Sequence, residues 1–135
     1  MEALMECAYK GGMLVSCRDQ ASGAELVVEA GVNEGRCHCS PPDLCAAALA
    51  SCMMTIIAGY AEVRGLGTEG LKASVATSVR ERPYSILRLA VTFSLSGKGW
   101  SEHDRTGVSR AIRSCPVHKA FSPQIAQEIA FDWLD

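Results

Sequence analysis

The sequence contains no run of basic residues and no segment in which basic and aromatic residues interleave. Its 135 residues include 13 Lys and Arg against 15 Asp and Glu, which gives a net charge of −2. Proteins that bind nucleic acid usually present a clustered positive surface to the phosphate backbone. We therefore expect no nucleic-acid partner.

Short motifs of several enzyme classes are also missing. The chain has no glycine-rich phosphate loop, no H-E-x-x-H, no G-x-S-x-G and no deaminase signature. Internal repeats, linkers and low-complexity segments are absent as well. With 48% apolar and 21% charged residues, a chain of this length can bury a real core. We expect a single α+β domain over residues 1–135.

No export signal is visible at the start of the sequence. Residues 1–5 lack a basic n-region, and no apolar h-region follows them. The chain has seven cysteines, a high and odd number. Without an export signal, cysteines are more often thiols than a disulfide framework. These features predict a cytoplasmic protein in which one or two cysteines are reactive.

Residues 40–65 form a long apolar stretch. Pro41 and Pro42 suit the first turn of a helix, and Asp43 suits the positive end of its dipole. No charge follows until Glu62. A helix that is apolar almost all round belongs in a core or at a subunit interface. A membrane span is disfavoured, because small polar residues interrupt the stretch and basic flanks and aromatic anchors are missing.

Strand patterns lie on both sides of this helix. Residues 1–29 contain two or three short strands between turn signals. Residues 71–82 and 87–95 alternate with period two and predict an antiparallel hairpin with one buried face. The predicted buried positions are Leu71, Ala73, Val75, Thr77 and Val79 in the first strand and Leu87, Leu89, Val91, Phe93 and Leu95 in the second.

The last third of the chain predicts two helices and a strand. Ser101 and Asp104 form the pattern of a capping box. The helix that follows places four apolar residues on one face: Val108, Ala111, Ile112 and Cys115. Pro116 interrupts it and can start a short helix over residues 116–121, with Cys115 at its N-cap. Residues 124–134 favour a final strand.

Two cysteines stand at positions where chemistry is conceivable. Cys115 precedes a helix start, which favours the thiolate, although a small buried residue on the apolar face is an equally good interpretation. Cys52 lies in an Ala-Leu-Met helix, where packing is the commoner role, and Cys45 lies one heptad earlier on the same face. His118, three residues after Cys115, is placed to steady a thiolate.

A zinc site is the alternative use of the cysteines. Cys37, His38, Cys39 and Cys45 are ligand types for zinc, and they would make the chain a zinc-stabilised interaction module. Yet the C-x-C-x5-C spacing lacks the usual paired C-x2–4-C and a distal pair. We expect no metal.

Two stretches taken together resemble the OsmC/Ohr family of osmotically induced and organic-hydroperoxide-resistance proteins. They are SPPDLCAAALASC at residues 40–52 and SCPVHKAF at residues 114–121. The family pattern is a Pro-acidic-x-Leu helix entry that reaches a mid-helix Cys, then a distant Cys-Pro motif. The order of predicted elements agrees, so the resemblance covers essentially the whole chain.

The resemblance implies an α+β fold built as an intertwined homodimer, with sheets wrapped around long central helices. It also implies a two-cysteine peroxidase. Cys52 would attack the peroxide O–O bond and become a sulfenic acid, and Cys115 would condense with it to a disulfide. An external dithiol, in family members often a lipoylated protein, would then reduce that disulfide. The resemblance implies no bound cofactor.

The supporting residues depart from the family pattern. Peroxidase members carry a glutamate directly after the entry proline, where this chain has Pro42, and Asp43 comes one residue later. They also carry an arginine near the first hairpin. Lys10 falls closest to that position, with Arg18 and Arg36 as substitutes. The implied catalytic set is Cys52, Cys115, Asp43, Lys10 and Arg18.

A non-catalytic function is the main alternative. A protein of the same fold can bind a small apolar or thiol-reactive ligand in the same pocket. The missing glutamate favours this alternative, and the retained cysteine pair favours the peroxidase.

Overall fold

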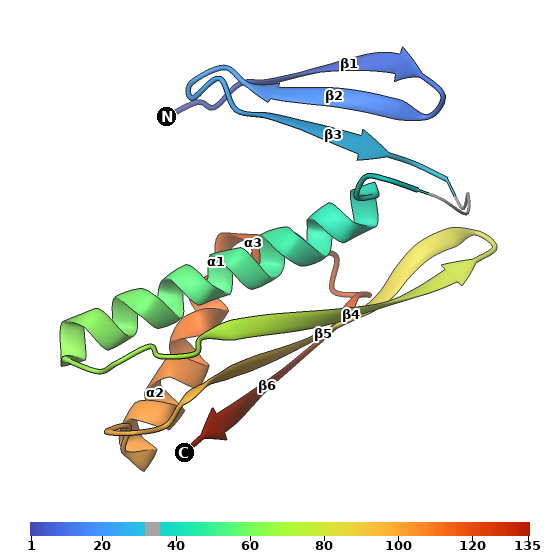
Figure 1. Cartoon of the computed structure of the whole chain (residues 1–135). Coiled ribbons are helices and arrows are strands. Elements are labelled where there is room, and N and C mark those ends of the chain that lie inside the picture. Colours follow the sequence, from blue (N-terminus) through green and yellow to red (C-terminus); the bar gives the residue numbers. More distant parts are fainter. Residues whose placement is uncertain (32–35) are drawn as a thin grey trace. The chain divides into compact units, whose positions relative to one another are not determined.

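A computed structural model describes residues 1–31 and 36–135 of the chain (Figure 1). The chain divides into two compact units, Met1–Leu44 and Cys45–Asp135. Each unit has its own three-stranded sheet. The α+β class predicted from the sequence is confirmed, and the single domain over residues 1–135 stays a prediction.

The first unit begins with three antiparallel strands in the order β1-β2-β3. They are β1 (Met5–Gly11), β2 (Leu14–Asp19) and β3 (Glu25–Glu29). Gly11 and Gly12 turn the chain between β1 and β2 with φ values of 84° and 61°, which glycine adopts without a steric penalty. The expectation of two or three strands in residues 1–29 is confirmed with three.

Helix α1 (Pro41–Arg64) starts in the first unit and continues into the second. The Ser40 amide donates to Asp43 Oδ2 at 2.9 Å, and the Asp43 amide donates to Ser40 Oγ at 3.2 Å. This reciprocal pair is a capping box, which satisfies two amides that the helix itself leaves without partners. At the other end Gly65, with φ of 67°, stops the helix.

Within the second unit, one side of α1 is buried and the other is exposed. The buried residues there are Ala46, Leu49, Ala50, Met53, Ile57 and Ala61. The exposed side carries mostly small residues, among them Ala48, Ser51, Thr55 and Gly59. A single chain therefore does not bury α1 on all sides, although its apolar sequence had led us to expect this. Among the described helices α1 alone is long and apolar enough to cross a membrane, yet one side of it is part of the hydrophobic core of the second unit.

The sheet of the second unit has the order β4-β5-β6. Its strands are β4 (Lys72–Glu81), β5 (Tyr84–Ser96) and β6 (Ala126–Leu134). β4 and β5 pair antiparallel, as predicted, and β6 lies parallel to β5. Helices α1 and α2 lie on one face of this sheet (Figure 1). Alternate residues of β5 are fully buried in the core cluster: Leu89, Val91, Phe93 and Leu95. The final strand predicted after Pro123 is confirmed.

Two predicted core positions of the hairpin are exposed instead. The register shifts between Ser78 and Val79, so that Ser78 pairs with Arg88 but Val79 pairs with Ile86. Leu87 is the extra residue of this β-bulge, and a shift by one residue moves side chains to the opposite face. Leu87 is consequently 43% exposed. Val79, on the strand without the extra residue, is 39% exposed near the end of the hairpin. Strict alternation was the wrong prediction at this end of the hairpin.

The helical segment after β5 is broken into three pieces. They are α2 (Glu102–Ala111), the 3-10 turn η1 (Ile112–Ser114) and α3 (Pro116–Ala120). The capping box of Ser101 and Asp104 is present, and Cys115 is the N-cap of α3. α2 ends earlier than a continuous face to Cys115 would require, but Val108, Ile112 and Cys115 are all buried in the same core.

A close approach between α2 and α1 requires glycine at position 107. A Cβ at Gly107 would collide with the hydroxyl of Tyr60. That hydroxyl is itself buried and has no hydrogen-bond partner within the described residues. The contact therefore leaves no space for even the smallest side chain.

We expect Gly107→Ala to lower the free energy of unfolding by about 1–3 kcal/mol, since overpacking outweighs the better helix propensity of alanine. In a Tyr60→Phe background, which removes the colliding oxygen, most of that loss should disappear. Urea denaturation of the two single variants and the double variant measures this coupling. Equal losses in both backgrounds would contradict the assigned contact.

Candidate active site

Two cysteines far apart in the sequence meet in the core of the second unit. Cys52 lies in the middle of α1 and is half-buried, while Cys115 at the start of α3 is fully buried. Cys115 belongs to the cluster in which α1 packs against β5, α2 and η1, and Cys52 packs against this cluster. The two thiols are close enough to share a hydrogen bond. The structure thus brings together the two cysteines of the sequence-predicted site.

The surroundings of Cys115 act on its thiol in opposite directions. Burial raises the pKa of the Cys115 thiol above its usual 9.0, and the hydrogen bond with Cys52 raises it further. The His118 amide, which donates to Cys115 Sγ at 3.3 Å, and the Val117 amide partly offset this rise. Burial is the largest cause, so Cys115 is held as the protonated thiol at neutral pH. The two amides at the helix N-terminus favour the thiolate, as the sequence suggested, but burial outweighs them.

His118 contributes its backbone to the thiol and its ring to a different contact. The ring nitrogen Nδ1 lies 2.6 Å from Gln127 Oε1, and Gln127 Nε2 donates to the His118 carbonyl at 3.0 Å. These two bonds join α3 to β6. The sequence pattern pointed to His118 but carried no signal for Gln127, which lies on a strand nine residues later.

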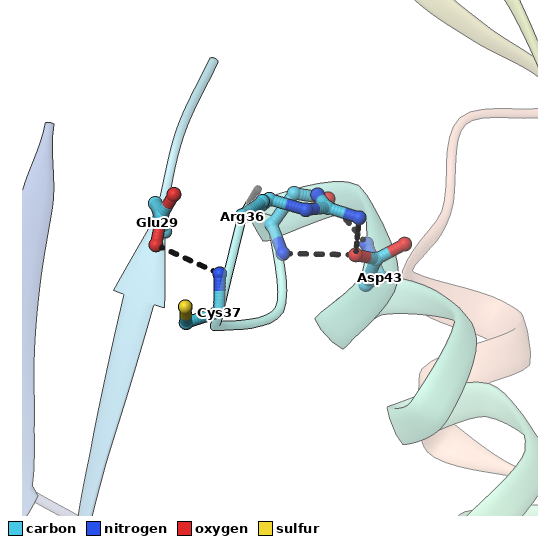
Figure 2. A network of polar contacts seen from close by, with 5 residues as sticks. Glu29, Arg36, Cys37 and Asp43 are labelled. Atoms are coloured by element: carbon cyan, nitrogen blue, oxygen red, sulfur yellow. Dashed lines mark hydrogen bonds and ion pairs between the residues drawn. The ribbon is translucent and has the colours of Figure 1, made fainter. Parts of the chain in front are cut away.

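Asp43 takes part in a polar network at the start of α1 (Figure 2). Besides the capping bonds with Ser40, its Oδ2 forms an ion pair with Arg36 Nη2 at 3.1 Å. The Ser40 amide is the main cause that lowers the pKa of the Asp43 carboxyl below 3.8, and the Arg36 guanidinium adds to it. Asp43 is therefore ionised, and among the basic residues considered from the sequence its partner is Arg36.

Lys10 and Arg18, the other predicted supporting residues, lie in the first unit. Lys10 is an exposed residue near the end of β1. Arg18 in β2 forms an ion pair with Glu25 of β3, with Nη1 and Oε1 3.2 Å apart. Arg18 is thus already engaged across its own sheet. A role for either residue toward Cys52 stays a prediction.

The candidate zinc ligands form a different local arrangement. Cys39 pairs with Val28 in an isolated parallel bridge, and the Cys37 amide donates to Glu29 Oε1 at 3.4 Å (Figure 2). Within residues 1–31 and 36–135, no group of three or more His, Cys, Asp or Glu side chains is arranged to hold a metal ion. The zinc-module alternative therefore receives no support from the described residues.

The raised pKa of Cys115 links stability to pH. Above about pH 9.0, the ordinary value for the thiol, the unfolded chain loses a proton that folded Cys115 keeps. The unfolded state then binds fewer protons, so the free energy of unfolding falls as pH rises through the folded pKa. We expect urea denaturation of the reduced protein to show this decline, and Cys115→Ala to flatten it. The exposed-cysteine control Cys39→Ala should keep the full slope, and equal slopes in all three proteins would refute the link.

Solved structures of similar fold include proteins linked to stress responses. A protein of Psychrobacter arcticus 273-4 named for osmotic stress induction and detoxification response is 26% identical, with a TM-score of 0.85 over 95% of this chain and 94% of the other. The organic hydroperoxide resistance protein OsmC of Legionella pneumophila is 15% identical, with a TM-score of 0.71 over 98% and 97% of the two chains. OhrB of Bacillus subtilis, an organic hydroperoxide resistance protein, is 15% identical, with a TM-score of 0.68 over 98% of each chain.

No curated protein sequence matches the chain. The family model described as OsmC-like protein, however, matches residues 33–130, which is well over half of the sequence. This match agrees with the α+β architecture. The chain therefore belongs to the OsmC/Ohr family.

Proposed function

We propose that the protein is a thiol-dependent peroxidase that reduces organic hydroperoxides through Cys52 and Cys115. The observation that carries this proposal is the contact between the two thiols, which belong to different elements of the second unit. A peroxidase of this type needs one thiol to attack the peroxide and a second within reach to resolve the product. The hydroperoxide-resistance names of the structural relatives support the same substrate class.

The different exposures of the two thiols support distinct roles for them in the proposed cycle. Cys52 is half-buried and is the thiol that a small peroxide can reach, whereas Cys115 is fully buried. The raised pKa keeps Cys115 protonated, so it does not compete for the peroxide. Cys52 is accordingly the peroxidatic thiol and Cys115 the resolving thiol.

The reaction proceeds in three balanced steps. The Cys52 thiolate attacks the terminal oxygen of the hydroperoxide, the O–O bond breaks, and the leaving alkoxide takes up a proton to become an alcohol. Cys52 is then a sulfenic acid. Cys115 sulfur attacks Cys52 sulfur, water leaves, and a disulfide forms. An external dithiol, of the lipoyl type in this proposal, reduces the disulfide and is itself oxidised to a disulfide.

The apolar surroundings of Cys52 favour organic over inorganic peroxides. Cys52 packs against the core cluster, with Met54 and Ile56 on neighbouring positions of α1. An alkyl or aryl group gains free energy when it leaves water for such surroundings, whereas hydrogen peroxide has no apolar part to bury. The preference of the protein for an organic hydroperoxide over hydrogen peroxide should therefore rise with the size of the organic group.

Asp43 and a basic residue are the proposed electrostatic support. The ion pair of Asp43 with Arg36 makes Arg36 the leading candidate for that basic residue, ahead of Lys10 and Arg18. The capping bonds give Asp43 a structural reason to be present even without catalysis. This favours, as a second candidate function, a non-catalytic protein that binds a small apolar or thiol-reactive ligand beside Cys52 and Cys115.

We expect Cys52→Ser to reduce hydroperoxide turnover to the uncatalysed rate, because the remaining thiol of the pair, Cys115, is fully buried and cannot attack the O–O bond. Cys115→Ser should lose sustained turnover but still consume one equivalent of peroxide, leaving a trappable sulfenic acid at Cys52. A coupled assay with cumene hydroperoxide and a lipoyl dithiol measures both. Cys45→Ser, a change on the same helix, should retain activity. A natural chain without turnover would favour the binding function.

We further propose that the protein is cytoplasmic and forms a homodimer. The homodimer is supported by the exposed side of α1, which carries the small residues Ala48, Ser51, Thr55 and Gly59. Small residues allow a second helix to approach closely, and burial there would complete the all-round burial expected of an apolar helix.

We expect Thr55→Arg, which places a long charged side chain on this flank, to convert a dimer into monomers in light scattering. Thr106→Arg is the matched control, because Thr106 is also an exposed helical threonine but lies on α2. The control should stay dimeric. Retention of the dimer by Thr55→Arg would assign the interface to another surface.

A further inference from the structure

A second pair of cysteines lies opposite one another in the sheet of the first unit. Cys7 of β1 and Cys17 of β2 are direct partners in the antiparallel register. Their sulfur atoms are 3.2 Å apart. Neither residue takes part in the site at Cys52 and Cys115, and the sequence pattern did not single them out as a pair.

The backbone positions of this pair are compatible with a disulfide. Directly opposed residues of antiparallel strands have Cα atoms about 4.5–5.5 Å apart. Disulfides span Cα separations of about 4.4–6.8 Å. The strands therefore need no rearrangement for the two sulfur atoms to move from contact into a covalent bond.

The two thiols differ in their access to solvent. Cys7 is exposed on the edge strand β1, and Cys17 is half-buried on the central strand β2. The hydrogen bond with Cys7 is the main cause that raises the pKa of the Cys17 thiol. An external reagent thus meets Cys7 first, and Cys17 is the protonated neighbour behind it.

We propose that Cys7 and Cys17 form a second redox site, which exchanges with small-molecule disulfides to give a cross-strand disulfide. The Cys7 thiolate attacks one sulfur of the small disulfide, whose S–S bond breaks and releases one thiol. Cys17 sulfur then attacks Cys7 sulfur of this mixed disulfide and displaces the second thiol. The net change is two protein thiols and one small disulfide converted into one protein disulfide and two small thiols.

The consequence is a reversible bond between the edge strand and the centre of its sheet. β1 pairs with β2 on one side only, since it is the first strand in the order β1-β2-β3. A bridge at Cys7 and Cys17 closes the hairpin that contains the turn at Gly11 and Gly12. Because Cys7 is exposed, a dithiol can open the bridge again, as is typical of labile disulfides.

The test uses the full natural chain, reduced and then incubated with oxidised glutathione, followed by intact mass and peptide mapping without reductant. We expect a loss of two hydrogen atoms that maps to a bridge between Cys7 and Cys17. Alkylation of Cys7 should fall by at least about tenfold and recover after treatment with a dithiol. This readout is independent of hydroperoxide turnover at Cys52, so either proposal can fail alone.

Two variants sharpen the result. Cys17→Ser removes the second step, so it should accumulate glutathione on Cys7. Cys39→Ser, a change at another exposed cysteine of the first unit, should still form the bridge. Absence of a bridge between Cys7 and Cys17 in the folded natural chain would overturn the proposal. The proposal would also be overturned if, in the Cys17→Ser protein, Cys7 accumulated no more glutathione than Cys39 does.

Discussion

The packing of one side of α1 against β5 is the interaction on which the rest of the second unit depends. Leu49, Met53 and Ile57 recur at helical spacing and are fully buried against alternate residues of β5. Because these residues set the rotation of α1, they also set which way Cys52 faces. The site is therefore a consequence of core packing, and its first thiol lies in the middle of the helix that packs on β5.

The second thiol reaches the site through a break in the following helices. α2 ends at Ala111, a 3-10 turn follows, and Pro116 starts α3 with Cys115 as its N-cap. A proline at the first position of a helix costs no hydrogen bond, so the chain can turn there and still bury Cys115. The same burial that places Cys115 beside Cys52 also raises its pKa. The burial of Cys115 is thus the common cause of its position beside Cys52 and of its protonation state.

The chain contains two cysteine pairs of opposite character. Cys52 and Cys115 come from separate helices and meet in an apolar core. Cys7 and Cys17 meet across neighbouring strands near the surface, where register alone determines their contact. The first pair is suited to a reaction with an apolar substrate, and the second is suited to exchange with reagents in solution.

Much of this architecture was predictable from local pattern. Period-two alternation identified the strands, the apolar run identified α1, and Ser101 with Asp104 identified the start of α2. Two motifs identified Cys52 and Cys115. These features depend on residues close together in the sequence, so the sequence by itself determined the elements and the family.

The tertiary structure decided what depends on distant partners. The bulge that exposes Leu87, the ion pair of Asp43 with Arg36, and the contacts of both cysteine pairs follow from strand register and packing, which no local pattern encodes.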